Sequence, residues 1–139
     1  MITLTKKFEF EAAHRLSNYQ GACKEIHGHT YKLAVTISGQ IDEESDMILD
    51  FKVLKNHVKK AILDHVDHAL ILKDAKENRQ IFQNYTGNIF WMTTEPTAER
   101  MLLWMVVQLT TILPPYIRLE SLQLYETSSS FASWKNSIG

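Results

Sequence analysis

The stretch HGHTYKLAVTIS at residues 27–38 decides the fold, because it places two histidines at the start of an alternating strand pattern. After His27 and His29, most even positions are polar, whereas the odd positions continue as Tyr31, Leu33, Val35 and Ile37. Successive side chains of a strand point to opposite faces, so we expect both imidazoles on the face that covers a core. A buried neutral imidazole needs a polar partner, and one divalent metal ion can serve both.

The stretch FEFEAAH at residues 8–14 has the same alternation and ends in His14. We expect segments 3–14 and 27–41 to pair as a hairpin, which would bring His14 beside His27 and His29. A single histidine on an apolar face is more often a hydrogen-bonded core residue, but three that converge favour a metal ion. Three histidines with an open fourth position are typical of catalytic zinc, and imidazole also binds iron, nickel and copper.

Cys23 lies in the loop between these two strands and has two main interpretations. It could close the site as a fourth ligand, which would make the zinc structural. It could instead be a nucleophile or base whose thiolate the nearby cation stabilises. A plain buried thiol is favoured less, because Gly21, Lys24 and Glu25 mark the loop as polar. Spacing alone leaves the first two interpretations open.

The composition bounds the class of protein. The 139 residues are enough for a core, and we treat residues 1–139 as a single domain. The net charge is −1 and the basic residues are scattered, so nucleic-acid binding has no support. A single cysteine excludes an internal disulfide and fits a cytoplasmic protein. We expect no signal peptide and no membrane span, since the apolar run at 101–107 is too short.

The rest of the chain predicts two helices and further strands. Apolar residues recur at helical spacing from Phe51 to about Val66. A second helix is expected from Pro96, at its first helical position, to about Leu113. Because that helix is apolar nearly all round over 101–107, we expect burial on more than one side, in a sheet or subunit interface. The other segments are predicted as follows: 69–72 extended, 73–80 loop, 88–93 a short strand, and 118–127 and 131–136 strands.

Glu126 has the same strand parity as Leu122 and Leu124, so its carboxylate is expected to point inward. An inward carboxylate is costly unless it is paired or binds a polar ligand. The spacing leaves open whether Glu126 forms a salt bridge with an arginine or anchors a ligand.

Five motifs, in order along nearly the whole chain, resemble the family of 6-pyruvoyl-tetrahydropterin and 6-carboxy-tetrahydropterin synthases. They are FEAAHRL at 10–16, CKEIHGH at 23–29, DFKVLK at 50–55, PTAE at 96–99 and YET at 125–127. The resemblance implies an α+β tunnelling fold (T-fold), with a four-stranded antiparallel sheet and two helices on one face in ββααββ order. It also implies a homo-oligomer, commonly a hexamer of two trimers.

The same resemblance assigns roles to site residues. It implies that the three histidines, His14, His27 and His29, bind zinc, that Cys23 is a proton acceptor and not a ligand, and that Glu126 holds the pterin ring. The family also has an Asp-His pair that works with the cysteine, and this chain offers Asp64-His65 and Asp67-His68. The distance from the motif at 50–55 and the apolar run at 69–72 favour Asp67-His68, because His65 belongs to the helix stripe.

Three residues separate Cys23 from His27, as in the bacterial carboxy-forming branch that feeds queuosine and other 7-deazaguanine pathways. The implied activity is that of a zinc-dependent lyase. It converts 7,8-dihydroneopterin triphosphate, a small-molecule pterin, to 6-carboxy-tetrahydropterin, acetaldehyde and triphosphate. The alternatives are the pyruvoyl-forming synthase or another enzyme that cleaves dihydropterin side chains, and a non-enzymatic domain with a structural zinc. Two features depart from the usual motifs: Glu25 is similar to a variant with Glu in place of the cysteine, and Ser128-Ser129-Ser130 replaces Pro-Thr-Ser.

Overall fold

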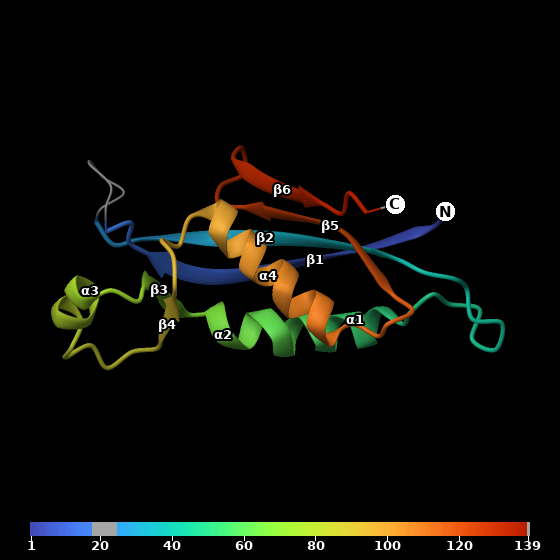
Figure 1. The fold of residues 1–139 in the computed structure, drawn as a ribbon, viewed down its shortest axis with the longest axis horizontal. Coiled ribbons are helices and arrows are strands. Elements are labelled where there is room, and N and C mark those ends of the chain that lie inside the picture. The colour runs from blue at the N-terminus through green and yellow to red at the C-terminus, as the bar shows by residue number, and fades with distance from the viewer. Residues whose placement is uncertain (18–24, 139) are drawn as a thin grey trace.

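A computed structural model describes residues 1–17 and 25–138 of the chain (Figure 1). Its centre is one six-stranded sheet in the order β4-β3-β1-β2-β5-β6. The strands are β1 Thr3–His14, β2 His27–Ser38, β3 Ala69–Lys73, β4 Ile89–Met92, β5 Arg118–Tyr125 and β6 Phe131–Lys135.

Strands β1 and β2 form the predicted antiparallel hairpin, and their pairing sets the register of the sheet. Thr3 lies opposite Ser38 at one end, and His14 lies opposite His27 at the other. The predicted alternation is confirmed, because Phe10, Tyr31 and Leu33 are each at most 2% exposed. The hairpin therefore carries its histidines on the same face as the hydrophobic core.

The expectation of a four-stranded antiparallel sheet in ββααββ order is correct for only part of the sheet. Strands β1, β2, β5 and β6 are antiparallel neighbours. Strands β3 and β4 add a parallel edge, with β3 beside β1 and β4 beside β3. The predicted extended segments at 69–72 and 88–93 are confirmed as strands. Residues 69–72 are all buried, so this short strand lacks the alternation that would have revealed its place in the sheet.

The first predicted helix is confirmed, with an irregularity at its centre. Helix α1, Phe51–Val58, continues through a π-helical turn at Lys59–Leu63 into α2, Asp64–Val66. The Asp50 side chain caps the start of α1 by accepting a hydrogen bond from the Lys52 N–H at 2.8 Å. The inward side chains of α1, the π-helical turn and α2 pack in one core with those of the sheet and of α4. These helices therefore cover the same face of the sheet.

The helix predicted from Pro96 to about Leu113 is confirmed as α4, Ala98–Ile112, but its start differs from the prediction. Thr97 is the N-cap and accepts from the Arg100 N–H at 3.2 Å, so Pro96 precedes the cap and is not the first helical residue. The helix is also not buried all round in the single chain, since Leu103 is 48% and Val107 58% exposed. Among the residues that the structure describes, no helix is long and apolar enough to cross a membrane.

The prediction of a loop at 73–80 is wrong, because helix α3 occupies Lys76–Ile81. This short, charged helix is held by a tertiary contact. Arg15 is buried and donates from Nη1 to Asn78 Oδ1 at 2.6 Å, while Asn78 Nδ2 donates to the Lys73 carbonyl at 2.9 Å. A helix of this length is not stable by itself, so local sequence patterns could not indicate it.

We predict that Asn78→Ala lowers the free energy of unfolding by about 1–3 kcal/mol, because it leaves Arg15 Nη1 without its acceptor and only the longer contact from Nη2 to Glu77 remains. Gln80→Ala, on the exposed side of the same helix, is the matched control and should lower the free energy of unfolding far less. Urea unfolding of both variants measures the difference. Equal midpoints for the two would show that the Arg15–Asn78 contact does not hold α3.

Candidate active site

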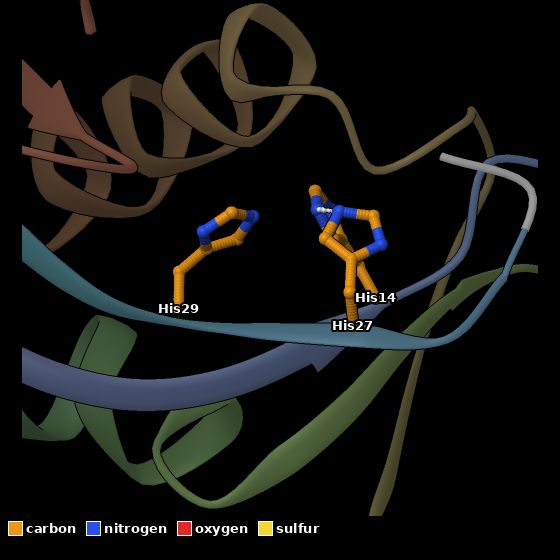
Figure 2. Close-up of side chains that lie close together, drawn as sticks. All are labelled: His14, His27 and His29. Atoms are coloured by element: carbon orange, nitrogen blue, oxygen red, sulfur yellow. Dashed lines mark hydrogen bonds between the residues drawn. The ribbon is translucent and has the colours of Figure 1, made fainter. Parts of the chain in front are cut away.

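Three imidazoles converge where β1 ends and β2 begins (Figure 2). One nitrogen from each of His14, His27 and His29 lies within 4.8 Å of the others. Strand pairing explains the convergence, because His14 is directly opposite His27 and Ala12 is opposite His29. The small Ala12 side chain leaves room for the His29 ring. The predicted cluster of three histidines is therefore present in the fold.

The hydrogen bonds around the rings leave nitrogen lone pairs facing one another. His14 Nδ1 is 2.8 Å from the Pro96 carbonyl, and His27 Nδ1 is 2.9 Å from the Glu25 carbonyl. Since a carbonyl only accepts, both neutral rings carry their proton on Nδ1. The two Nε2 atoms, 2.9 Å apart, then present lone pairs to each other. A cation between them removes this repulsion, so the donor set fits a metal ion.

His14 Nε2 and His27 Nε2 are 2.9 Å apart, and the donor nitrogens of all three rings lie within 4.8 Å of one another. A tetrahedral ion with metal–nitrogen bonds of about 2.0–2.1 Å would hold its ligand nitrogens roughly 3.3 Å apart, a spacing that falls within this range. Burial lowers the pKa of His14, and the neighbouring His27 and His29 act in the same direction, against the Pro96 hydrogen bond and Glu126. A lowered pKa keeps His14 neutral, which is the form that binds metals.

Glu126 follows β5 directly and points toward the histidines, as its strand parity predicts. Its Oε2 lies 3.5 Å from His14 Nε2 and 3.7 Å from His29 Nε2. Within residues 1–17 and 25–138, the ionisable partners of this carboxylate are histidines, and no arginine forms a salt bridge with it. Glu126 stands at the edge of the histidine cluster, where it can bind either the metal or a ligand held beside it.

Tyr31 is a site residue that sequence reasoning missed. Its side chain is fully buried, and its hydroxyl lies 3.4 Å from His14 Nδ1. Burial raises the pKa of Tyr31, and the Glu126 carboxylate raises it further. Because His14 Nδ1 already carries a proton, the Tyr31 hydroxyl is free to donate to Glu126. Tyr31 has the parity of the core stripe, so its sequence position indicated packing and gave no sign of this polar role.

The structure forms the Asp67-His68 pair but does not bring it to the histidine cluster within one chain. Asp67 Oδ1 is 3.0 Å from His68 Nδ1 and accepts from the Glu11 N–H at 3.0 Å, while the His68 N–H donates to the Glu11 carbonyl at 2.6 Å. His68 also lines a pocket together with Glu11 and Thr30, whose side chains have the opposite strand parity to His14, so the pair borders the other face of the sheet. His68 adopts φ 60°, a conformation uncommon for residues other than glycine.

The alternative pair, Asp64-His65, is occupied elsewhere. Asp64 accepts from Lys59 Nζ at 2.8 Å, and the His65 ring packs 5.9 Å from both Phe90 and Trp104. These are a surface ion pair and an aromatic packing contact, and the preference for Asp67-His68 stays a prediction. Cys23 lies outside the described residues, and its predicted role stays a prediction.

Comparison with known proteins gives this site a context. The sequence profile of the 6-pyruvoyl tetrahydropterin synthase family matches residues 3–137. A Rickettsia typhi protein named 6-carboxy-5,6,7,8-tetrahydropterin synthase is 36% identical over 135 residues, covering 94% of this chain and 98% of the relative. A Haemophilus influenzae protein of the same name is 34% identical over 142 residues, covering 97% and 99%. The chain therefore belongs to the 6-pyruvoyl tetrahydropterin synthase family.

Solved structures agree on the fold. The 6-pyruvoyl tetrahydropterin synthase of Caenorhabditis elegans superposes with a TM-score of 0.73 at 26% identity, covering 98% of this chain and 96% of that one. An uncharacterised protein from Wolinella succinogenes superposes with a TM-score of 0.81, over 98% of both chains. Its identity of 20% supports a shared fold and nothing further.

Proposed function

We propose that this chain is a zinc-dependent 6-carboxy-5,6,7,8-tetrahydropterin synthase. In the reaction, 7,8-dihydroneopterin triphosphate and water give 6-carboxy-tetrahydropterin, acetaldehyde and triphosphate, a step toward queuosine and related 7-deazaguanines. The observation that carries the proposal is the convergence of His14, His27 and His29 beside the inward Glu126 carboxylate. The names of the Rickettsia and Haemophilus relatives support the carboxy-forming branch.

His14, His27 and His29 would hold the zinc ion, and the fourth position would be left to the substrate. When bound, zinc supplies a Lewis acid that stabilises negative charge on substrate side-chain oxygens. The buried His14, fixed by the Pro96 carbonyl, keeps the ion at the end of β1. Glu126 would hold the guanidine-like edge of the pterin ring, since a carboxylate accepts two parallel hydrogen bonds there.

Cys23, as a thiolate, would remove a proton from a substrate side-chain carbon, and Asp67-His68 would set its protonation and return protons. In one chain this pair is hydrogen-bonded to the backbone of Glu11, and His68 lines a pocket with Glu11 and Thr30, whose side chains point away from the histidine face. The proposed relay therefore needs the pair to reach the site of another copy. This supports the homo-oligomer, proposed as two trimers, as do the open sheet edges at β4 and β6.

Product analysis tests the proposed reaction. We expect the zinc-loaded protein to convert 7,8-dihydroneopterin triphosphate to 6-carboxy-tetrahydropterin and acetaldehyde, both identified by mass spectrometry. Removing zinc with a chelator should abolish turnover, and restoring zinc should recover it. Formation of 6-pyruvoyl-tetrahydropterin would place the chain in the pyruvoyl-forming branch. The absence of any turnover by the zinc-loaded protein would contradict the proposed activity.

Replacement of Cys23 separates a catalytic from a structural zinc site. If Cys23 is a proton acceptor, Cys23→Ala should keep one zinc per chain and its thermal stability while losing about 10²–10⁴-fold in turnover. Zinc content and unfolding temperature are measured together with activity. Loss of zinc and stability in Cys23→Ala would instead identify Cys23 as the fourth ligand and favour a non-enzymatic domain.

Replacement of Glu126 tests its role as the pterin anchor. Glu126→Gln keeps the size of the side chain but removes its charge, so we expect pterin affinity to fall by about 10–100-fold, the usual loss for a charge-assisted hydrogen bond. Titration with fluorescent 6-carboxypterin measures the affinity, and Glu43→Gln, an exposed carboxylate, is the control. Zinc content should not change; its loss in Glu126→Gln would mean that Glu126 is itself a ligand.

A further inference from the structure

Two consecutive residues before helix α4 are tied to the end of β1 at two points. The Pro96 carbonyl accepts from His14 Nδ1 at 2.8 Å. Both carboxylate oxygens of Glu95 bind Ser17, three residues further along: Oε2 accepts from the Ser17 N–H at 2.9 Å, and Oε1 accepts from the Ser17 hydroxyl. Residues 95–96 therefore contact the chain on both sides of this strand end. Pro96 binds the His14 imidazole, and Glu95 binds Ser17, which follows it.

The backbone of residues 95–96 is restricted in conformation. Proline fixes its own φ and restricts the preceding residue to extended conformations, so few backbone torsions between Glu95 and the Pro96 carbonyl are free to change. Pro96 is buried, and the next residue, Thr97, caps α4. The carbonyl that orients His14 is thus held on one side by the start of a helix and on the other by the Glu95 carboxylate.

The contacts of Pro96 and Glu95 both affect the His14 ring. Pro96 binds the ring itself, and Glu95 binds the backbone three residues after it. Ser17 is only 8% exposed, so its N–H needs an acceptor inside the protein, and Glu95 is that acceptor. The Glu95 carboxylate links the segment after His14 to the segment that carries the Pro96 carbonyl. Without it, this hydrogen-bonded link is lost. The acceptor of a ligating histidine's second nitrogen fixes the tautomer and orientation of the ring.

We propose that Glu95 is a positioning residue for the metal centre. By clamping Ser17 it holds the Pro96 carbonyl against His14 Nδ1, which keeps His14 Nε2 directed at the ion. This role rests on the proposed function, because it requires a metal ion at the three histidines. Neither the family motifs nor the geometry of the three ligands by itself assigns Glu95 a part in the site.

The test compares the metal affinity of four full-length variants with that of the wild type. Glu95→Ala removes both acceptors, Glu95→Gln keeps the size and one acceptor, and Ser17→Ala removes only the hydroxyl donor. Glu99→Gln, an exposed carboxylate four residues along, is the control. Zinc affinity is measured by competition with a chromophoric chelator. The visible absorption of the cobalt-substituted protein reports coordination geometry, and thermal unfolding of the metal-free protein reports stability.

We expect Glu95→Ala to weaken zinc binding by about 10–100-fold, the usual loss when the partner of a ligating histidine is disturbed. The zinc affinities of Glu95→Gln and Ser17→Ala should lie between those of Glu95→Ala and the wild type. The zinc affinity of Glu99→Gln should equal that of the wild type. The tetrahedral cobalt bands should weaken in the same order. If Glu95→Ala does not fold, Glu95→Gln and Ser17→Ala decide by the same measurements.

Two outcomes overturn the proposal, and they are distinguishable. Variants at Glu95 that unfold at a lower temperature without metal, yet bind zinc and show cobalt spectra like the wild type, would make Glu95 a purely structural contact. A wild-type protein that binds neither zinc nor cobalt would overturn the proposed metal centre, and the positioning role with it.

Discussion

The antiparallel pairing of β1 with β2 is the constraint on which the rest of the structure depends. It places His14 opposite His27 and Ala12 opposite His29, so three imidazoles share one face of the sheet. The same parity buries Phe10, Tyr31 and Leu33 in the core. A shift of one residue in this register would turn the affected strand's histidines away from the others and expose its core side chains. The register that buries the hydrophobic core is therefore also the register that assembles the site.

Around the histidines, polar contacts come from segments that are distant in the sequence. The Pro96 carbonyl orients His14, Glu126 approaches His14 and His29, and the hydroxyl of the buried Tyr31 lies near the His14 ring. Each of these groups would be costly to bury alone, because an unpaired polar group in the interior loses its hydration. Their mutual contacts offset that cost and hold the ring nitrogens in the orientation that a metal ion requires.

Each error of the sequence analysis has a physical cause. Strand β3 is buried on both faces and lacks alternation, so its parallel pairing with β1 was not visible. Helix α3 depends on the contact between Asn78 and the buried Arg15, which are 63 residues apart. Pro96 is favourable at a helix start, but the Thr97 hydroxyl was available one residue later to cap the helix. In the first two cases a tertiary contact decided the local structure, and in the third a local hydrogen bond at the helix start did.

The sequence by itself determined the hairpin, the two long helices, the identity of the three histidines and the inward direction of Glu126. All of these follow from periodicity, because side-chain direction repeats every two residues in a strand and every 3.6 in a helix. Only the tertiary structure decided that Tyr31 and Glu95 serve the site, and that Asp67-His68 borders the opposite face. These features depend on contacts between segments that are distant in the sequence, and local periodicity does not indicate such contacts.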